Sequence, residues 1–297
     1  MTEHVQTKTE IKALLDRFGV RPRKRLGQHF LIDGNLMRRL AASAELRGDD
    51  TVLEIGPGTG GLTDLLIAGA KRVIAVEMDP AMQAILRERF AGQSGFELIA
   101  TDALANRNRL ADEVLAALRA LSPADRRRLK LVANLPYRIA SPALVNLLLR
   151  NTPPVLYCFT VQKEVADRLA ASPRTKDYGP LSILFQALCD IRHVAAVPPS
   201  GFWPEPQVAS TMLRITPSVR PLYEGESPAR FMRRVRAGFA SRRKTLRSNL
   251  RRHLGPEVTA ELEQHLDLDR RAEELCVAEW VSLDALVAGR TNPPPAG

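Results

Sequence analysis

The feature that most constrains the fold is a regular alternation of strand-like and helix-like stretches over residues 51–215. Short apolar runs each precede a stretch whose apolar residues recur at helical spacing. The strand candidates are residues 51–56, 72–79, 96–103, 129–137 and 155–162. Strands alternating with helices over this length predict βαβ units around a parallel sheet that is covered by helices on both faces.

The alternation ends at Ile215, and a stretch rich in Pro, Ser and Gly follows it. Residues 230–290 have a mostly helical pattern and few strand signals. We therefore expect an α/β domain of the Rossmann-like type and a smaller α-helical domain. The expected limits are an N-terminal extension over 1–20, the Rossmann-like domain over 21–216, a linker over 217–228, the helical domain over 229–290 and a disordered tail over 291–297.

A glycine-rich turn follows the first strand candidate and contains Gly56, Gly58 and Gly61. Glycines let the backbone turn tightly and approach a ligand closely, and the start of the following helix offers unpaired N–H groups. Glu77 ends the next strand candidate, where a carboxylate can accept hydrogen bonds from ribose hydroxyls. The turn therefore predicts a nucleotide-containing cofactor.

Two classes of cofactor fit this turn. Its glycines satisfy the G-x-G-x-x-G pattern of nicotinamide dinucleotide enzymes, so an oxidoreductase stays open as an alternative. Two carboxylates favour S-adenosylmethionine instead. Glu54 stands two residues before the first glycine, and Asp102 ends the third strand candidate, in a suitable place for an adenine amino group. A glycine turn that binds no ligand is the remaining alternative.

The fourth strand candidate ends in Asn134, Leu135, Pro136 and Tyr137. Ligands of open α/β sheets bind beyond the carboxyl ends of the strands. The Asn134 side chain and a backbone carbonyl of this motif can accept both hydrogens of an adenine amine, which localises the nitrogen lone pair. Tyr137 can stack on a base that has been splayed out of a helix, and Phe202 can enclose it from the other side. The alternative is a strand-end turn and a capping loop whose aromatic side chains pack in the core.

Together these motifs resemble the ribosomal RNA adenine N6,N6-dimethyltransferase family, whose relatives include the erythromycin-resistance rRNA methylases. The likeness extends over about residues 21–285 and includes RKRLGQHFL, LEIGPGTGGLT, VIAVEMD, TDAL, NLPY, FWPEPQV and RRKTLRSNL. The resemblance implies S-adenosylmethionine as the methyl donor. It also implies dimethylation of two adjacent adenines near the 3′ end of small-subunit rRNA in the assembling small ribosomal subunit.

The resemblance assigns the site residues as well. Those implied to contact the cofactor are His29, Leu31, Gly56, Glu77, Asp102 and Asn134. Those implied to hold the adenine are Asn134, Pro136, Tyr137 and Phe202. The chain departs from the family at His29, where Asn is also common, and at Gln207 and Ala209, where Lys and Asp are expected. These departures leave the exact adenines and the number of methyl groups open.

The charge of the chain is concentrated in one segment. The net charge is +10, and nine basic residues but no acidic ones lie within residues 231–252. As one helix, this segment would carry an apolar stripe and a basic face suited to RNA phosphates. The residues expected to bind RNA are Arg233, Arg234, Arg236, Arg242, Arg243, Lys244, Arg247 and Arg251. A solvated surface helix, or a helix that lies on an anionic membrane, is the alternative.

Other classes of protein are disfavoured by composition. The three cysteines are far apart and the histidines lack metal-ligand spacing, so neither a disulfide framework nor a metal site is expected. The N-terminus lacks the apolar segment of a signal peptide, and no run is long enough for a membrane span. We expect a cytoplasmic, monomeric enzyme. The competing hypotheses are a large-subunit rRNA adenine methylase and an RNA-binding ribosome-assembly factor with secondary catalysis.

Overall fold

The computed structural model describes residues 5–23, 27–225 and 227–291. The chain forms two units, the first from residues 1–166 and 192–216 and the second from residues 167–191 and 217–297. Two predicted segments lie partly outside the described residues: all but the first residue of the tail expected to be disordered (291–297), and residues 24–26 of the RKRLGQHFL motif.

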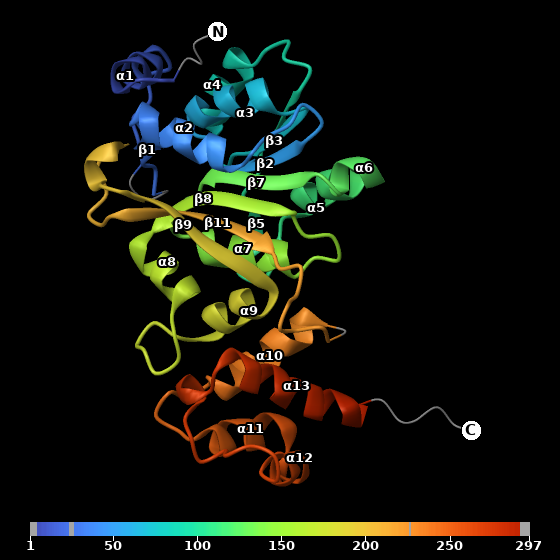
Figure 1. Cartoon of the computed structure of the whole chain (residues 1–297). Coiled ribbons are helices and arrows are strands. Elements are labelled where there is room, and N and C mark those ends of the chain that lie inside the picture. Colours follow the sequence, from blue (N-terminus) through green and yellow to red (C-terminus); the bar gives the residue numbers. More distant parts are fainter. Residues whose placement is uncertain (1–4, 24–26, 226, 292–297) are drawn as a thin grey trace. The chain divides into compact units, whose positions relative to one another are not determined.

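A seven-stranded sheet in the order β4-β3-β2-β7-β8-β11-β9 organises the first unit (Figure 1). Its strands are β2 (Thr51–Ile55), β3 (Arg72–Val76), β4 (Phe96–Ile99), β7 (Leu129–Asn134), β8 (Leu156–Gln162), β9 (Cys189–Val197) and β11 (Ser210–Pro217). β2, β3, β4, β7 and β8 pair in parallel, which confirms the predicted βαβ core. The sheet is mixed rather than wholly parallel, because β11 pairs with β8 in the antiparallel direction.

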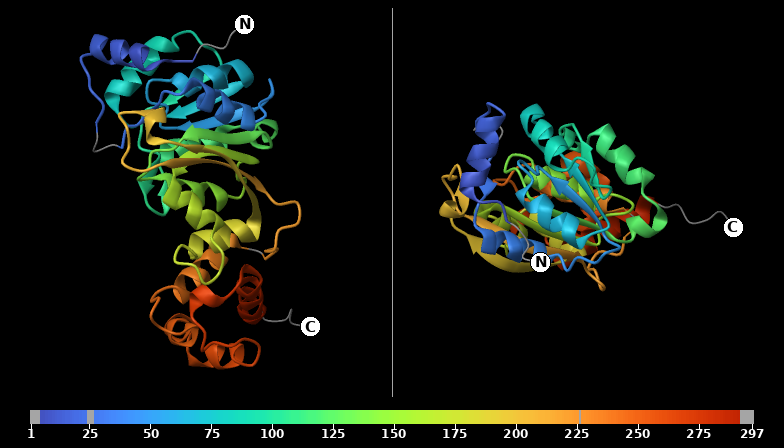
Figure 2. Two further views of the ribbon diagram at one scale, coloured as in Figure 1. Left: turned by 60° about the vertical axis from the view of Figure 1, so that its left-hand side comes forward. Right: turned by 90° about the horizontal axis from the view of Figure 1, so that it is seen from above.

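Helices cover both faces of this sheet. The helices of the first unit are α1 (Lys8–Arg17), α2 (Gly34–Ser43), α3 (Gly61–Gly69), α4 (Pro80–Arg89), α5 (Asp112–Ala120), α6 (Pro123–Arg126) and α7 (Ala140–Leu148). Helix α8 (Lys163–Ala170) begins in the first unit and ends in the second. Figures 1 and 2 show α2, α3 and α4 on one face and α7 on the other. All five residues of β2 are buried, as expected for a parallel strand packed on both sides.

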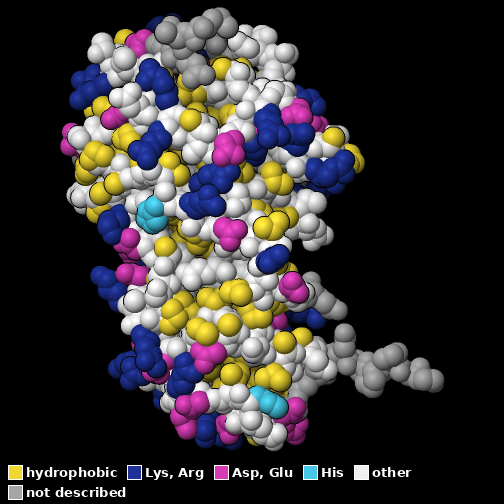
Figure 3. Space-filling view, viewed as in Figure 1, with side chains coloured by type: hydrophobic (Ala, Val, Ile, Leu, Met, Phe, Trp, Pro, Cys, Tyr) yellow, Lys and Arg dark blue, Asp and Glu magenta, His cyan; other side chains and the backbone are white. Residues whose placement is uncertain are grey.

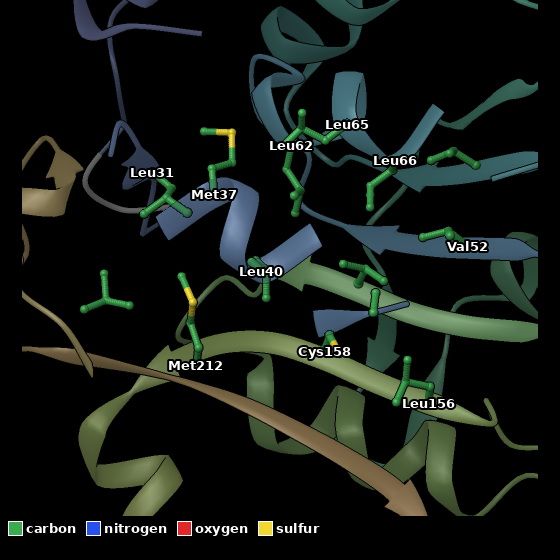
Figure 4. Close-up of a cluster of buried hydrophobic side chains, with 14 of the residues drawn as sticks. Leu31, Met37, Leu40, Val52, Leu62, Leu65, Leu66, Leu156, Cys158 and Met212 are labelled. Carbon is green, nitrogen blue, oxygen red and sulfur yellow. The ribbon is translucent and has the colours of Figure 1, made fainter. Parts of the chain in front are cut away.

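The main core of the first unit lies between the sheet and the helices α2 and α3. Apolar side chains from the helices meet alternate residues of the strands, because successive strand residues point to opposite faces. Members of this buried cluster include Leu31, Met37, Leu40, Val52, Leu62, Leu65, Leu66, Leu156, Cys158 and Met212 (Figure 4). The cluster gives the carboxyl ends of β2 and β7 a rigid support.

Two short ladders complete the first unit. β1 (Phe30–Leu31) pairs with β10 (Phe202–Trp203), which follows a short 3₁₀ turn at Pro199–Gly201. β5 (Leu104–Asn106) pairs with β6 (Arg109–Leu110). The β1–β10 ladder joins the end of the RKRLGQHFL motif to a loop about 170 residues later in the chain. Sequence patterns did not reveal this contact between distant segments.

The second unit is helical. Its elements include α9 (Pro180–Leu188), α10 (Pro228–Gly238), α11 (Leu246–Leu254), α12 (Pro256–Leu262), a 3₁₀ turn (Ala272–Glu274) and α13 (Val277–Thr291). Its core forms around Trp280, which is fully buried and stacks on Phe239 with 5.7 Å between ring centroids. Tyr178 is also buried and donates a hydrogen bond from its hydroxyl to the Leu275 carbonyl at 2.9 Å.

The expectation of one helix over residues 231–252 is wrong. The basic segment forms two helices, since α10 ends at Gly238 and α11 begins at Leu246. The Asn249 amide donates to the carbonyls of Gly238 and Ser241 at 2.6 and 3.0 Å, so the open end of α10 is satisfied by a side chain instead of by a further turn. The Trp280 ring packs against the end of α10 at Gly238. A Cβ atom at this position would lie 2.3 Å from the ring, so a larger residue does not fit there.

Within the described part of the chain, no helix combines the length and apolarity that crossing a membrane requires.

Candidate active site

A cavity of about 450 Å³ lies at the carboxyl ends of β2 and β7. At this point the strand order reverses, because β2 is flanked by β3 on one side and by β7 on the other. Such a switch point is where open α/β sheets bind their ligands. The cavity lining brings together these predicted site residues: His29, Leu31, Gly56, Glu77, Asp102, Asn134, Pro136 and Tyr137.

Two glycines form one wall of the cavity by close backbone contact. Gly56 and Gly58 have φ angles of +73° and +58°, a region that side-chain-bearing residues rarely adopt. A Cβ atom at Gly56 would lie 2.6 Å from the Pro136 ring, and one at Gly58 would lie 2.8 Å from the Phe30 ring. Both the backbone conformation and the surrounding space therefore require glycine here.

Two acidic side chains are held in place by backbone N–H groups. Glu77 is buried, and its carboxylate accepts hydrogen bonds from the Gly58 and Asp79 N–H groups at 3.2 and 2.8 Å. Burial raises the pKa of Glu77 to about 7. Asp102 accepts a hydrogen bond from the Leu104 N–H at 3.0 Å. Both carboxylates line the cavity and can accept hydrogen bonds from hydroxyl or amino groups of a ligand.

Glu54 lies beneath the glycine turn and is almost fully buried. The Thr63 hydroxyl donates a hydrogen bond to it at 2.7 Å. Burial is the main cause that raises the pKa of Glu54 to about 8, so the protonated form predominates at pH 7. A protonated carboxyl can donate as well as accept a hydrogen bond on this side of the cavity.

The Asn134 side chain has one satisfied end and one unsatisfied end. Its amide nitrogen donates to the His29 carbonyl at 2.9 Å. Its Oδ1 atom is buried and has no hydrogen-bond partner among the residues that the structure describes. A buried acceptor without a partner costs free energy, about 1–3 kcal/mol, unless a donor reaches it. The arrangement therefore leaves an acceptor ready for an N–H group of a ligand.

Tyr137 is held by two contacts. Its ring stacks on the His29 imidazole with 5.4 Å between centroids and 26° between planes. Its hydroxyl is 2.7 Å from the Ser210 hydroxyl. Burial raises the pKa of Tyr137, so the phenol is neutral near pH 7. The His29 Nδ1 atom is 2.6 Å from the Pro204 carbonyl, so this nitrogen carries a proton and donates it there.

Phe202 does not lie where the sequence placed it. The structure buries it to 1% exposure among the core residues that include Leu31 and Met37, and it is not part of the described cavity lining. The register of the β1–β10 ladder explains this position. Leu31 pairs with Phe202 and Phe30 pairs with Trp203, so Phe202 shares the core face with Leu31.

Sequence reasoning missed several residues that support this cavity. Gln28 donates to the Asp79 carboxylate at 2.8 Å, and Arg23 forms an ion pair with the same group at 3.1 Å. Asp79 also caps α4 by accepting from the Ala81 N–H. These contacts tie Arg23 and the cavity-lining Gln28 to the start of α4. The sequence could have indicated these residues, because Gln28 lies in the RKRLGQHFL motif and Asp79 in the VIAVEMD motif.

The segment expected as a simple N-terminal extension also forms part of the cavity wall. Gln6 is buried and accepts a hydrogen bond from the Thr59 hydroxyl of the glycine turn at 2.6 Å. Ile11 of α1 lines the cavity and packs in a cluster with Phe30 and Ile85. Residues from Gln6 onward therefore belong to the site and were missed because no motif marks them.

The basic segment of the second unit separates into paired and unpaired residues. The Arg234 side chain is only 12% exposed and forms an ion pair with the buried Asp284 at 2.5 Å, so its charge is neutralised instead of being presented to RNA as predicted. Arg242 donates to the Lys176 and Tyr178 carbonyls, and Arg247 forms ion pairs with Glu263 and Asp269. Other basic residues of this segment are exposed and form no ion pair within the described residues 227–291; they are Arg233, Arg243, Lys244, Arg251 and Arg252.

Comparison with known proteins gives consistent matches. The family described as ribosomal RNA adenine dimethylase matches residues 19–288 of the chain. A ribosomal RNA small subunit methyltransferase A from Geobacillus thermodenitrificans is 39% identical, with 95% of this chain and 97% of the relative covered. Another protein of that name, from Magnetococcus marinus, is 40% identical, with 92% and 94% covered.

Two solved structures resemble the whole fold. A dimethyladenosine transferase from Plasmodium falciparum has a TM-score of 0.70 at 23% identity and covers 89% of this chain and 98% of its own, which shows a shared fold. The 23S rRNA methyltransferase ErmE has a TM-score of 0.60 at 28% identity and covers 87% of this chain and 99% of its own.

Proposed function

Because this chain belongs to the ribosomal RNA adenine dimethylase family, we propose that it dimethylates N6 of two adjacent adenines near the 3′ end of small-subunit rRNA during ribosome assembly. The observation that best supports the reaction is the buried Oδ1 atom of Asn134, a cavity-lining residue, because this atom has no hydrogen-bond partner in the described part of the chain. The small subunit is favoured over the large one because the curated relatives carry that name.

The residues present fit S-adenosylmethionine. The glycine wall at Gly56 and Gly58 allows a close approach to the backbone, and the carboxylates of Glu77 and Asp102 suit ribose hydroxyls and an adenine amino group. His29 and Leu31 complete the proposed cofactor contacts. When bound, this cofactor supplies a methyl group on a sulfonium centre, which is an electrophile.

The protein's part in the reaction is to prepare a weak nucleophile. The N6 amine of adenine is unreactive because its lone pair is delocalised into the ring. Asn134 Oδ1 accepts one N6 hydrogen, and the backbone carbonyl of Leu135 or Pro136 accepts the other, which localises the lone pair. Tyr137 stacks on the base. No strong base is needed, because the amine releases its proton after transfer, and positioning with electrostatics supplies most of the rate.

The exposed basic residues of the second unit are proposed to bind RNA phosphates. Contacts of this kind position RNA and make binding salt-dependent without reading its sequence. We propose that Arg243, Lys244 and Arg251 carry most of this contact and that Arg233 contributes to it. A cytoplasmic location and a monomeric state stay part of the proposal.

Labelled methyl transfer tests this function directly. The purified protein is incubated with labelled S-adenosylmethionine and small ribosomal subunits that lack the modification, and methylated adenines are mapped. We expect incorporation at two adjacent adenines near the 3′ end of the rRNA. Absence of incorporation by a protein that binds the cofactor normally contradicts the proposal, and incorporation into large-subunit rRNA instead supports the competing substrate.

A further inference from the structure

We propose that His29 and Ser210 are positioning residues that fix Tyr137 and Asn134 for the reaction. The inference rests on the proposed adenine methylation and assigns roles to contacts outside the reaction motif itself. Neither residue needs to touch the adenine. Each acts on a side chain of the motif, from a segment distant in sequence: His29 lies beside β1, and Ser210 is the first residue of β11.

Ser210 holds the hydroxyl end of Tyr137. The side chain of Ser210 is 1% exposed, and its backbone pairs with Gln162 of β8 in the antiparallel ladder. β8 in turn pairs in parallel with β7, the strand that ends at Asn134. The serine hydroxyl is therefore presented by the same rigid sheet that carries the reaction motif. A hydroxyl in such a place restricts the Tyr137 side chain at a distance of 2.7 Å.

His29 holds the ring of Tyr137 and the amide of Asn134 at once. The imidazole stacks on the phenol ring, and the backbone carbonyl accepts the Asn134 amide hydrogen at 2.9 Å. Because an amide has one donor end and one acceptor end, this hydrogen bond turns Oδ1 away from His29 and leaves it for the ligand. The imidazole is itself anchored through Nδ1 to the Pro204 carbonyl at 2.6 Å.

The two contacts on Tyr137 restrain it in complementary ways. Stacking on His29 limits rotation of the phenol ring, and the base is proposed to stack on the opposite face. The hydrogen bond to Ser210 fixes the position of the hydroxyl end of the side chain. A displacement of about 1 Å at a reacting centre can cost about a hundredfold in rate. Loss of the Ser210 hydrogen bond is therefore expected to lower kcat while leaving the affinity for cofactor and RNA nearly unchanged. Loss of the His29 ring is expected to lower kcat when it is measured at saturating cofactor.

A double-mutant cycle tests the Ser210 contact. Tyr137→Phe, Ser210→Ala and the double variant are compared with the wild type by kcat, by KM for small subunits and by cofactor Kd. We expect each single change to lower kcat about tenfold or more, and the double change to be no worse than the larger single effect, because both remove one interaction. Ser94→Ala, on an exposed loop, is the matched control and keeps wild-type rates.

The His29 contact is tested with His29→Asn and His29→Phe at saturating cofactor. Asn keeps a polar side chain but removes the stacked ring, whereas Phe keeps a ring and removes the hydrogen bond to Pro204. We expect His29→Phe to retain more kcat than His29→Asn. Melting temperatures within a few degrees of the wild type separate positioning from loss of fold.

The outcomes are distinct. If the wild type transfers no methyl groups, the proposed function fails. If the wild type is active and the Ser210 and Tyr137 changes have independent, multiplying effects on kcat, or none, the positioning role of Ser210 is overturned. Equal kcat for wild type and His29→Asn overturns the role of the His29 ring.

Discussion

At the scale of single residues, Glu77 is a carboxyl group in the cofactor cavity that changes its protonation near neutral pH. Burial raises its pKa to about 7, and two backbone N–H groups hold its carboxylate. The charged form, which dominates above that pKa, accepts ribose hydroxyls better than the protonated form. We therefore expect cofactor affinity to rise by up to about tenfold between pH 6 and pH 8. Calorimetric titration of S-adenosylmethionine across this range measures the change.

The control for this prediction is Glu77→Gln, which keeps the size of the side chain and cannot ionise. Its pH profile reports the titration of the ligand and of neighbouring groups such as Glu54, whose pKa is about 8. Subtracting the pH profile of the variant from that of the wild type gives the contribution of Glu77 to cofactor affinity. If the two profiles are parallel, Glu77 is not the group whose titration changes the affinity.

Gly58 allows the cost of backbone conformation to be separated from the cost of lost space. Gly58 and Gly92 have φ angles of +58° and +78°, but only at Gly58 would a Cβ atom meet a neighbour, the Phe30 ring at 2.8 Å. Gly92→Ala should cost about 1–2 kcal/mol of stability from the conformation alone. Gly58→Ala should cost more and also weaken cofactor binding. Urea unfolding and cofactor titration of both variants measure the difference, and equal stability losses with unchanged binding contradict it.

At the scale of elements, local patterns located the parts of the sheet that carry the site. The apolar runs before Gly56 and before Asn134 became β2 and β7, because a buried parallel strand is itself a short apolar run. The strands end earlier than predicted, since residues such as Asp102 and Tyr137 belong to the loops that line the cavity. Element type followed from local sequence, and element ends depended on packing.

Contacts between distant segments explain what the sequence could not show. Phe202 was expected in the site because aromatic residues favour base stacking, but its pairing with Leu31 turns it into the core. Arg234 looked like its basic neighbours, and Asp284, 50 residues away, neutralises it. In both cases the deciding partner lies far along the chain, and no periodicity in a short window records it.

Asn249 is the residue on which the break between α10 and α11 depends. Its amide satisfies two carbonyls at 2.6 and 3.0 Å, and it is 5% exposed, so water cannot easily replace it. Asn249→Ala should destabilise the protein by about 1–3 kcal/mol by leaving these acceptors without donors. Chemical denaturation measures the loss, with the exposed Asn151→Ala as the control. Equal stability of the two variants contradicts this role.

At the scale of the whole molecule, the net charge of +10 is distributed unevenly. On the face seen in Figure 3, many Lys and Arg side chains lie among Asp and Glu side chains, which lowers the local field. Within the basic segment, ion pairs with acidic side chains neutralise the charges of Arg234 and Arg247. Arg243 and Lys244 are exposed neighbours in the turn between α10 and α11, so the helix break places two cations on one tight loop.

This loop should therefore make a larger contribution to RNA binding than equally charged positions elsewhere. We expect the double variant Arg243→Gln with Lys244→Gln to weaken binding to unmodified small subunits by about tenfold or more at low salt. The slope of log K against log salt should fall by about 1.5–2, as expected for two lost phosphate contacts. Cofactor Kd, and kcat at saturating subunits, should stay at wild-type values, because the changes do not touch the cavity.

The matched control is Arg39→Gln with Arg47→Gln, which removes the same charge from two exposed positions of the first unit. If binding depends on net charge alone, both double variants lose the same affinity and the same salt slope, because long-range attraction does not distinguish where a charge lies. If the loop contacts phosphates directly, only the Arg243 and Lys244 variant has a smaller slope of log K against log salt. The slope depends on the number of phosphate contacts that release counterions, and not on the total charge of the protein. Equal losses in the two proteins would therefore remove this loop from the RNA-binding surface.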